Sequence, residues 1–390
     1  MALTKVSTGV VDMSGNTGGL VIAQGITAQQ TTCNAAKLGA IRENTTTNTI
    51  EVCTNNSGTP AWKTLKEVAP AAPLTVDFLV IAGGGGGGPG FQAAGGGAGG
   101  FRTSFGTGNI NGGLTAVEST LNLAVATSYT VTIGVPGAGG AGSAMSAGRG
   151  ATGSASFFSD GNTTFEILTI GGGGGASYNN YNAGGLSNNG SPGGSGGGAA
   201  PHNTGTTANG GTRVTTPVQG FNGGNAISYA DPYFGAGGGG AGGIGQVAGG
   251  ANTGNGGLGL QSSITGLNTF YAAGGAGGAY YSYLGAPNAA ASGIGGSGAA
   301  ASGARGGVGF TAPGNGTVNT GSGGGGGADN GQVGGDGGKG VVILRYPDAY
   351  QITFTNGASP IVSSNAVVGT DIVTTITSGT GGTIIFSLKP

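Results

Sequence analysis

The fold is decided by the stretch Val76-Asp77-Phe78-Leu79-Val80-Ile81-Ala82, which leads directly into six consecutive glycines at residues 83–88. The order is reversed near the other end of the chain, where glycine precedes Val341-Val342-Ile343-Leu344-Arg345-Tyr346. Five more glycines, residues 171–175, follow Phe165-Glu166-Ile167-Leu168-Thr169-Ile170. Apolar, β-branched runs are typical of strands. The pattern therefore predicts strands that feed polyglycine segments.

Glycine makes up 98 of the 390 residues, against an average near 7% in proteins. It does not fall at every third position, which excludes collagen. Aperiodic glycine at this level commonly means disorder, because glycine loses the most backbone freedom on folding. We expect an ordered body instead, in which polyglycine II helices of three residues per turn lie side by side and hydrogen-bond through their backbones.

Such a body needs support from other elements. Each lateral hydrogen bond contributes about 0.5–1.5 kcal/mol, whereas fixing each residue costs about 1–2 kcal/mol of backbone entropy. The two terms nearly cancel, so we expect apolar strands to frame the helices. The predicted fold class is all-β or irregular: a polyglycine II helix sandwich framed by β-strands, with small β modules at both ends. The framing strands are expected at Val76–Ala82, Tyr129–Val135, Phe165–Ile170 and Gly340–Tyr346.

Composition divides the chain into five parts. Proline and alanine mark a short linker, and alternation of apolar and polar residues returns where glycine thins out. From the N-terminus we expect an extended attachment segment (1–30), a small β-hairpin module (31–68), a linker (69–75), the glycine-rich sandwich domain (76–346) and a small C-terminal β domain (347–390).

The two cysteines, Cys33 and Cys53, flank the predicted hairpin. Two cysteines without a secretion signal are more often reduced thiols or small core residues than a disulfide. Both readings stay open. The pair is too small for a metal site without a histidine nearby, and we expect neither a metal nor a cofactor.

The charge pattern limits the possible partners. Twelve basic and 13 acidic residues give a formal net charge of −1, which leaves no basic field for nucleic acid. No apolar run approaches the length of a membrane helix, and residues 1–7 lack the apolar region of a signal peptide. We therefore expect synthesis in the cytoplasm, no membrane insertion and no nucleic-acid partner.

Motifs for catalysis are weak. The stretch Phe78–Gly88 has the glycines of a dinucleotide site, but that site needs a helix after the glycines and an acidic residue about 20 positions on. His202 is the only histidine, and a surface position is its more ordinary role. A glycan hydrolase usually requires paired carboxylates, and Asp231 is the only one between residues 172 and 328. We expect no enzyme activity.

Two aspartates, Asp329 and Asp336, lie in a glycine-rich segment that faintly resembles a calcium-binding repeat. A single copy is a weak signal, and turn chemistry explains it as well. Ice binding is a further possibility for an ordered polyglycine bundle.

Tyrosine is the better candidate for binding. Eight of the 11 tyrosines fall between residues 178 and 283. Polyglycine interiors have no room for these rings, so we expect them on loops or outer faces, where tyrosine offers a large contact area at low entropic cost. The alternative is that the rings only cover the flanks of the glycine helices. The candidate receptor-binding residues are Tyr178, Tyr181, Tyr229, Tyr233, Tyr280, Tyr281 and Tyr283.

Two groups of residues resemble a known family. The module from Cys33 to Trp62, with Gly39-Ala40-Ile41-Arg42 and Ile50-Glu51-Val52-Cys53, resembles a short β-module of tail-fibre proteins in tailed bacteriophages. The glycine-rich domain of such fibres, especially in marine phages, is similar to Phe78–Gly85, Gly96–Arg102 and Gly340–Tyr346. The distal adhesins of some T-even-type phages are similar in kind.

The resemblance implies a virion tail fibre or adhesin, made in the host cytoplasm. Residues 1–68 would attach to phage tail or baseplate proteins. The loops between Tyr178 and Tyr283, or alternatively the C-terminal β domain, would bind a host cell-surface receptor, either a glycan or an outer-membrane protein. Adsorption without covalent chemistry and a homotrimeric assembly are expected. The alternative is a bacterial surface adhesin or extracellular filament subunit built on the same glycine framework.

Overall fold

The computed structural model divides the chain into two compact units, Met1–Ala71 and Ala72–Pro390. The boundary falls within the linker expected at residues 69–75. In the described residues the regular structure consists of β-strands and three short 3₁₀ turns, which confirms the predicted all-β class. The residues described are 23–25, 27–30, 32–47, 49–56, 58–65, 73–108, 110–141, 148–161, 165–178, 188–201, 207–227, 233–249, 252–280, 294–296, 312–328, 331–355 and 357–389.

The first unit is a four-stranded sheet in the order β1-β2-β3-β4. Strands β2, β3 and β4 form an antiparallel meander, and β1 lies parallel to β2. The predicted hairpin corresponds to β2 and β3. The bounds are β1 (Ala23–Gly25), β2 (Ile41–Asn44), β3 (Thr49–Asn56) and β4 (Thr59–Thr64).

A disulfide joins Cys33 and Cys53, with an S–S distance of 2.02 Å. Cys53 lies in β3 and is fully buried. The same sheet holds a buried ion pair, in which Arg42 Nε lies 3.2 Å from Glu51 Oε2, and the Arg42 guanidinium stacks over the Trp62 ring. These contacts give a small sheet a compact polar and covalent core.

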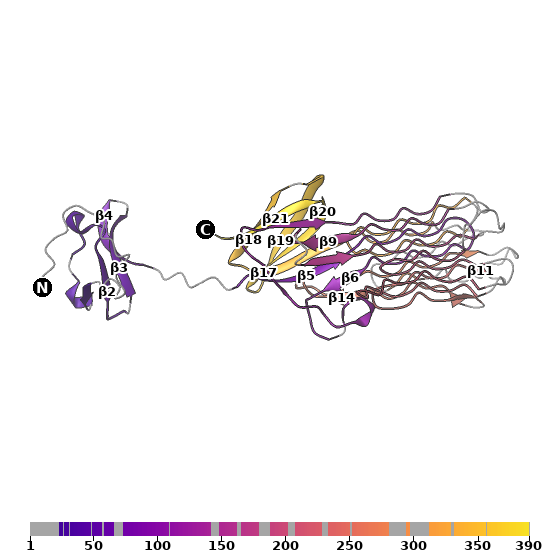
Figure 1. Ribbon diagram of the computed structural model, residues 1–390, viewed down its shortest axis with the longest axis horizontal. Helices are drawn as coiled ribbons and strands as arrows, with labels where there is room; N and C mark the ends of the chain where they lie inside the picture. The colour runs from indigo at the N-terminus through magenta and orange to yellow at the C-terminus, as the bar shows by residue number, and fades with distance from the viewer. Residues whose placement is uncertain are drawn as a thin grey trace. The chain divides into compact units, whose positions relative to one another are not determined.

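The second unit begins as a β-sandwich of two sheets (Figure 1). One sheet has the order β19-β20-β17-β5-β6, with β7 paired to β5, and the other has the order β18-β21-β8-β9-β10. The bounds are β5 (Thr75–Ile81), β6 (Phe101–Thr103), β7 (Leu121–Asn122), β8 (Ser128–Thr132), β9 (Ser156–Ser159), β10 (Glu166–Thr169), β17 (Val341–Pro347), β18 (Tyr350–Thr355), β19 (Ser359–Val368), β20 (Asp371–Thr380) and β21 (Gly382–Leu388).

Strands β5 and β17 are apolar at consecutive positions because both of their faces are covered. Phe78 and Val80 point into the core between the two sheets, together with Phe158 and Phe386. Leu79 and Ile81 belong to a second core on the other face of the sheet. A strand buried on both sides needs an unbroken apolar run rather than alternation, which explains the consecutive apolar residues from Phe78 to Ala82.

Residues 347–390 do not form a separate β domain, contrary to expectation. Strands β19 and β20 extend the sheet of β5 and β17, whereas β18 and β21 extend the sheet of β8. Strands β20 and β21 place Ile376, Ile384 and Phe386 in the core between the two sheets, because a sheet must bury its apolar face against another layer. The alternating strands after Tyr346 therefore supply part of the sandwich core itself.

Three short strand pairs lie elsewhere in this unit. The hairpin of β14 and β15 covers the outer face of the first sheet with Tyr271 and Ile264, which join the core of Leu79 and Ile81. The bounds are β11 (Tyr233–Phe234), β12 (Ala248–Gly249), β13 (Asn252–Thr253), β14 (Leu260–Ser262), β15 (Thr269–Tyr271) and β16 (Ala279–Tyr280), paired as β11–β16, β12–β13 and β14–β15.

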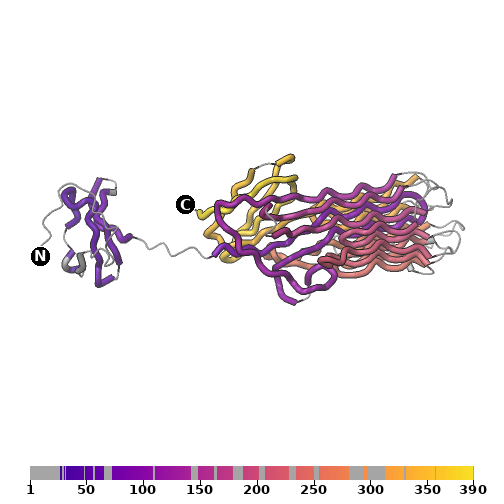
Figure 2. Tube along the Cα trace, in the orientation of Figure 1, coloured from indigo at the N-terminus to yellow at the C-terminus, as the bar shows by residue number. Residues whose placement is uncertain are grey.

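Beyond the sandwich, the chain forms an array of glycine-rich helices that lie side by side (Figure 2). Residues 83–88 show how it is built: successive N–H groups donate to three neighbouring segments in rotation, with N–O distances of 2.8–3.0 Å. A neighbour that recurs at every third residue indicates a helix of three residues per turn. In chain order, the acceptors are the carbonyls of Ser154, Gly338, Gly97, Ala151, Gly335 and Ala94.

The carbonyls of the same segment accept from three other segments, 137–140, 172–175 and 324–327. Three neighbours of each kind surround the helix, so its backbone polar groups are satisfied laterally. A Cβ on Gly85 would lie 2.2 Å from the Gly173 oxygen, and one on Gly96 would lie 2.1 Å from the Gly85 oxygen. The array therefore requires glycine, and the predicted polyglycine II body is confirmed.

Candidate functional site

The described glycine segments leave the sandwich and return to it. The segment after β5 is followed by one that leads back to β6, and the segment after β8 by one that leads back to β9. The end of the array remote from the sandwich is therefore where outgoing and returning segments meet, and β11 lies there (Figure 1). We call this the loop end. The described segments that stop at it end at residues 141, 178, 201, 227, 249, 280 and 328.

Two of the candidate tyrosines have described side chains. Tyr178 is only 6% exposed, so its ring offers little surface to a partner. Tyr280 is half-buried and lies in β16, opposite Tyr233 of β11 in the antiparallel register. The structure thus brings the backbones of Tyr233 and Tyr280 together at the loop end. Tyr181, Tyr229, Tyr281 and Tyr283 lie outside the described residues, as do His202 and Asp231.

The ring of Tyr280 packs edge-on against Phe91, with 4.5 Å between ring centroids. Phe91 belongs to the turn that joins two of the innermost glycine segments, and the next residue, Gln92, adopts a left-handed backbone with φ of 46°. Phe91 is also half-buried. Sequence reasoning missed it, although a single aromatic residue after Pro89 and Gly90 in a glycine-rich stretch was an available signal.

Asparagine side chains complete the array at its rim. An outer helix has no neighbour on one side, so some N–H groups lack a carbonyl partner. Asn222 and Asn225, three residues apart, accept from the N–H groups of Arg213 and Gly210 at 2.9 Å each. Asn189, Asn255 and Asn315 accept from the N–H groups of Asn209, Ile294 and Asp336 at 2.7–2.8 Å.

Asp336 has the same role. Its Oδ1 accepts a hydrogen bond from the Gly139 N–H of a neighbouring segment at 2.7 Å. Asp329, its partner in the calcium alternative, lies outside the described residues. In the described part of the chain, no three metal-ligating side chains cluster together. The Asp336 carboxylate therefore already serves as a hydrogen-bond acceptor within the array.

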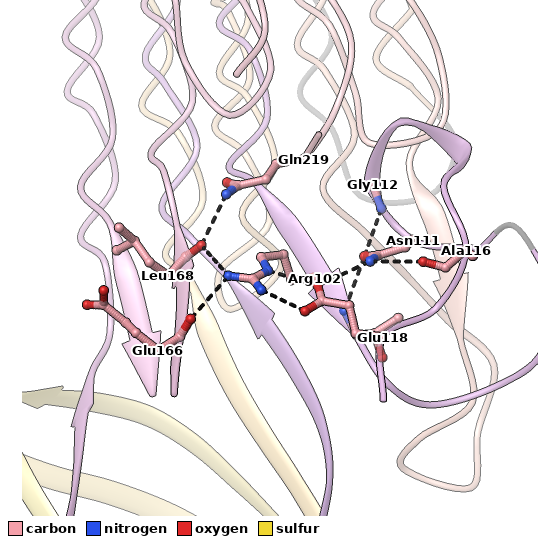
Figure 3. A network of polar contacts seen from close by, with 9 residues as sticks. Arg102, Asn111, Gly112, Ala116, Glu118, Glu166, Leu168 and Gln219 are labelled. Atoms are coloured by element: carbon pink, nitrogen blue, oxygen red, sulfur yellow. Dashed lines mark hydrogen bonds and ion pairs between the residues drawn. The ribbon is translucent and has the colours of Figure 1, made fainter. Parts of the chain in front are cut away.

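A polar network clamps the array to the sandwich (Figure 3). Arg102 of β6 donates from Nε and Nη2 to the Glu118 carboxylate at 2.8 and 2.6 Å. Its Nη1 donates to the Leu168 carbonyl of β10 at 3.2 Å. Gln219 Nε2 donates to the same carbonyl at 3.1 Å, while Gln219 Oε1 accepts from the Ile170 N–H at 2.9 Å. The network holds the point where β10 becomes a glycine helix.

A second charged cluster lies in the sandwich. Ser104 Oγ donates to Asp77 Oδ1 at 2.8 Å, and Arg345 Nε pairs with Asp371 Oδ2 at 2.8 Å. Burial raises the pKa of the Asp77 carboxyl above its ordinary value, while the hydrogen bond from Ser104 and the charge of Arg345 oppose that rise. The Arg345 guanidinium also lies 5.0 Å from the centre of the Phe105 ring. These contacts fasten neighbouring strands together.

Among the described residues, no helix is both long and apolar enough to cross a membrane.

Comparison with known proteins identifies the glycine-rich part. No curated protein matches the chain. The family model of a glycine-rich domain matches residues 54–347, which is more than half of the chain. The match spans the helices of the array and the framing strands from β5 to β17. By this match, the chain belongs to the glycine-rich domain family.

Proposed function

We propose that this protein is a tail fibre or adhesin of a tailed bacteriophage and that its loop end binds a receptor on the host cell. The observation that carries the proposal is the layout of the array, in which rigid glycine segments turn back at one end, away from the sandwich. Variable loops on a rigid scaffold are a common way to carry recognition. The glycine array would supply the rigidity without needing a large apolar core.

Recognition in this proposal uses adaptable polar and aromatic contacts. The half-buried rings of Phe91 and Tyr280 form a small aromatic platform at the loop end. Aromatic rings that are held in place lose little entropy on binding. A glycan or the loops of an outer-membrane protein would suit such a surface. Binding is reversible adsorption, with no bond made or broken.

In this proposal the first unit, Met1–Ala71, attaches the protein to the phage tail or baseplate. The protein would be made in the host cytoplasm and would end in the virion, assembled as a homotrimer. The alternative function is that of a bacterial surface adhesin or extracellular filament subunit. Immunogold electron microscopy with an antibody against residues 76–346 separates the two, because label on virion tails supports the fibre and label on cell filaments supports the alternative.

Adsorption competition tests the loop end directly. The purified chain, added to host cells before phage, should reduce phage adsorption. The double variant Phe91→Ala/Tyr280→Ala should compete at least tenfold less well. The matched control is Leu267→Ala, which removes an apolar side chain that is 73% exposed near the sandwich end and should compete like wild type. Equal competition by all three proteins would remove the loop-end platform from the proposal.

A further inference from the structure

One edge of the β-sandwich is closed by side chains. Strands β6 and β10 lie against each other there. Arg102 of β6 donates to the carbonyls of Glu166 and Leu168 in β10, and Gln219 donates to Leu168 as well. An additional strand would have needed these carbonyls as hydrogen-bond acceptors. The edge is therefore protected against strand addition, as edges in soluble proteins usually are.

The opposite edge is formed by β18 and β19. In the described part of the chain, β19 pairs only with β20, and β18 only with β21. Natural edge strands are commonly protected by charges, proline or bulges. In β19 these devices are confined to the first half, with Pro360 and register shifts that end at Ser363. The remainder, Ser363–Val368, pairs regularly.

The open part of this edge is uncharged and exposed. Residues 363–367 are all exposed, and Val367 is 73% exposed. Strand β18 carries no charge either, and its side chains at Gln351, Thr353 and Thr355 are exposed. Neither strand therefore favours a charged partner, and neither would repel a second uncharged strand.

The two edge strands run in opposite directions. Strand β19 is antiparallel to β20, which is antiparallel to β17, so β19 runs with β17 away from the glycine array. Strand β18 is antiparallel to β21, which is antiparallel to β8, so β18 runs with β8 toward the array. An antiparallel pair of β19 from one copy and β18 from another therefore joins two copies whose arrays point the same way.

We propose that the chain self-associates through this edge, with residues 363–368 of one copy pairing with β18 of the next. The occupant is a second copy because both uncharged edges are present on every chain and are of similar length. Such a contact joins two different surfaces of the chain, so successive copies close into a ring when the rotation between them permits it. All loop ends would then face one side. The proposal concerns assembly of the purified chain and does not depend on the identity of the receptor.

Sedimentation of the full chain tests the proposal. Wild type should form a discrete oligomer, whereas Ser364→Lys/Ala366→Lys and Thr353→Lys should each shift the protein to monomer, because lysine on an edge strand opposes strand addition. All three positions are exposed. The control Gln261→Lys places lysine at an exposed position of the β14–β15 hairpin and should leave the oligomer intact. A monomeric wild type, or edge variants that sediment like the control, would overturn the proposal.

Cysteine cross-linking tests the direction of the contact. A mixture of Thr353→Cys and Ser364→Cys chains should form an interchain disulfide under mild oxidation, and Ser364→Cys alone should not. The native cysteines are already joined to each other, so they do not compete. A disulfide between two Ser364→Cys chains would place β19 against β19. It would contradict the pairing of β19 with β18, in which the arrays of both copies point the same way.

Discussion

At the residue scale, glycine stabilises this protein through the side chain that it lacks. Neighbouring helices approach so closely that a Cβ added at many array positions would lie about 2 Å from a backbone oxygen, as at Gly85 and Gly96. Backbone atoms cannot rotate away as a side chain can. The tolerance of each glycine to substitution should therefore depend on its depth in the array.

The substitution Gly85→Ala should lower the free energy of unfolding by about 3 kcal/mol or more, because overpacking here displaces a neighbouring backbone. Gly148→Ala is the matched control, since a Cβ there would meet nothing within 4 Å and should change stability by about 0.5 kcal/mol or less. Denaturant unfolding of the two variants measures both effects. Similar losses would show that space is not what selects glycine at position 85.

Asp77 should weaken the fold as pH rises. Burial raises its pKa in the folded state, so the folded protein holds this proton more tightly than the unfolded chain does. Its contribution to stability is therefore present below the unfolded pKa and is lost as pH rises through the folded pKa. Asp77→Asn should remove this loss and flatten the stability profile above about pH 4. Thermal unfolding across pH tests this, and identical profiles would contradict it.

At the element scale, each polyglycine helix depends on its neighbours because it has no internal hydrogen bonds. Inner helices obtain their partners from surrounding backbones, as residues 83–88 do. Outer helices lack some of those neighbours, and asparagine side chains replace the missing carbonyls. The asparagine spacing of three between Asn222 and Asn225 follows from the helix period.

Replacing both Asn222 and Asn225 by alanine should lower the free energy of unfolding by about 1–3 kcal/mol in total, at about 0.5–1.5 kcal/mol for each lost hydrogen bond. Hydrogen exchange should increase at the Arg213 and Gly210 amides, which those side chains accept from. Asn268→Ala, at an exposed position of the β14–β15 hairpin, is the control. Unchanged exchange at both amides would argue against the rim role.

At the scale of the whole molecule, the two units are stabilised by different means. The first has a small sheet with a disulfide and a buried ion pair. The second has two apolar cores and the glycine array. Small domains with little apolar core often depend on such cross-links.

Replacing Cys33 and Cys53 by serine should destabilise the first unit by about 3 kcal/mol, the value expected for a disulfide that closes a loop of this size. The second unit should unfold unchanged. Calorimetry of the wild-type and variant chains would show whether only one transition moves. A shift of both transitions would mean that the two units do not unfold independently.

How much of the protein could be predicted depended on the range of the interactions involved. Apolar runs beside polyglycine were enough to predict the strands and the three-residue helices, because only glycine permits backbones to approach so closely. The Phe91–Tyr280 pair could not be predicted, since its rings come from segments far apart in the chain. Nor could the role of Asn222, because the same amide suits a binding loop or the rim of an array.

The sequence by itself determined that this is an all-β protein with a polyglycine II body, since local composition dictates both backbone geometries. Only the tertiary structure decided that residues 347–390 complete the sandwich, that Cys33 and Cys53 meet, and which asparagines serve the array. It also decided which strands lie at open edges. These outcomes depend on which distant segments become neighbours, and a repetitive glycine sequence carries little information about that choice.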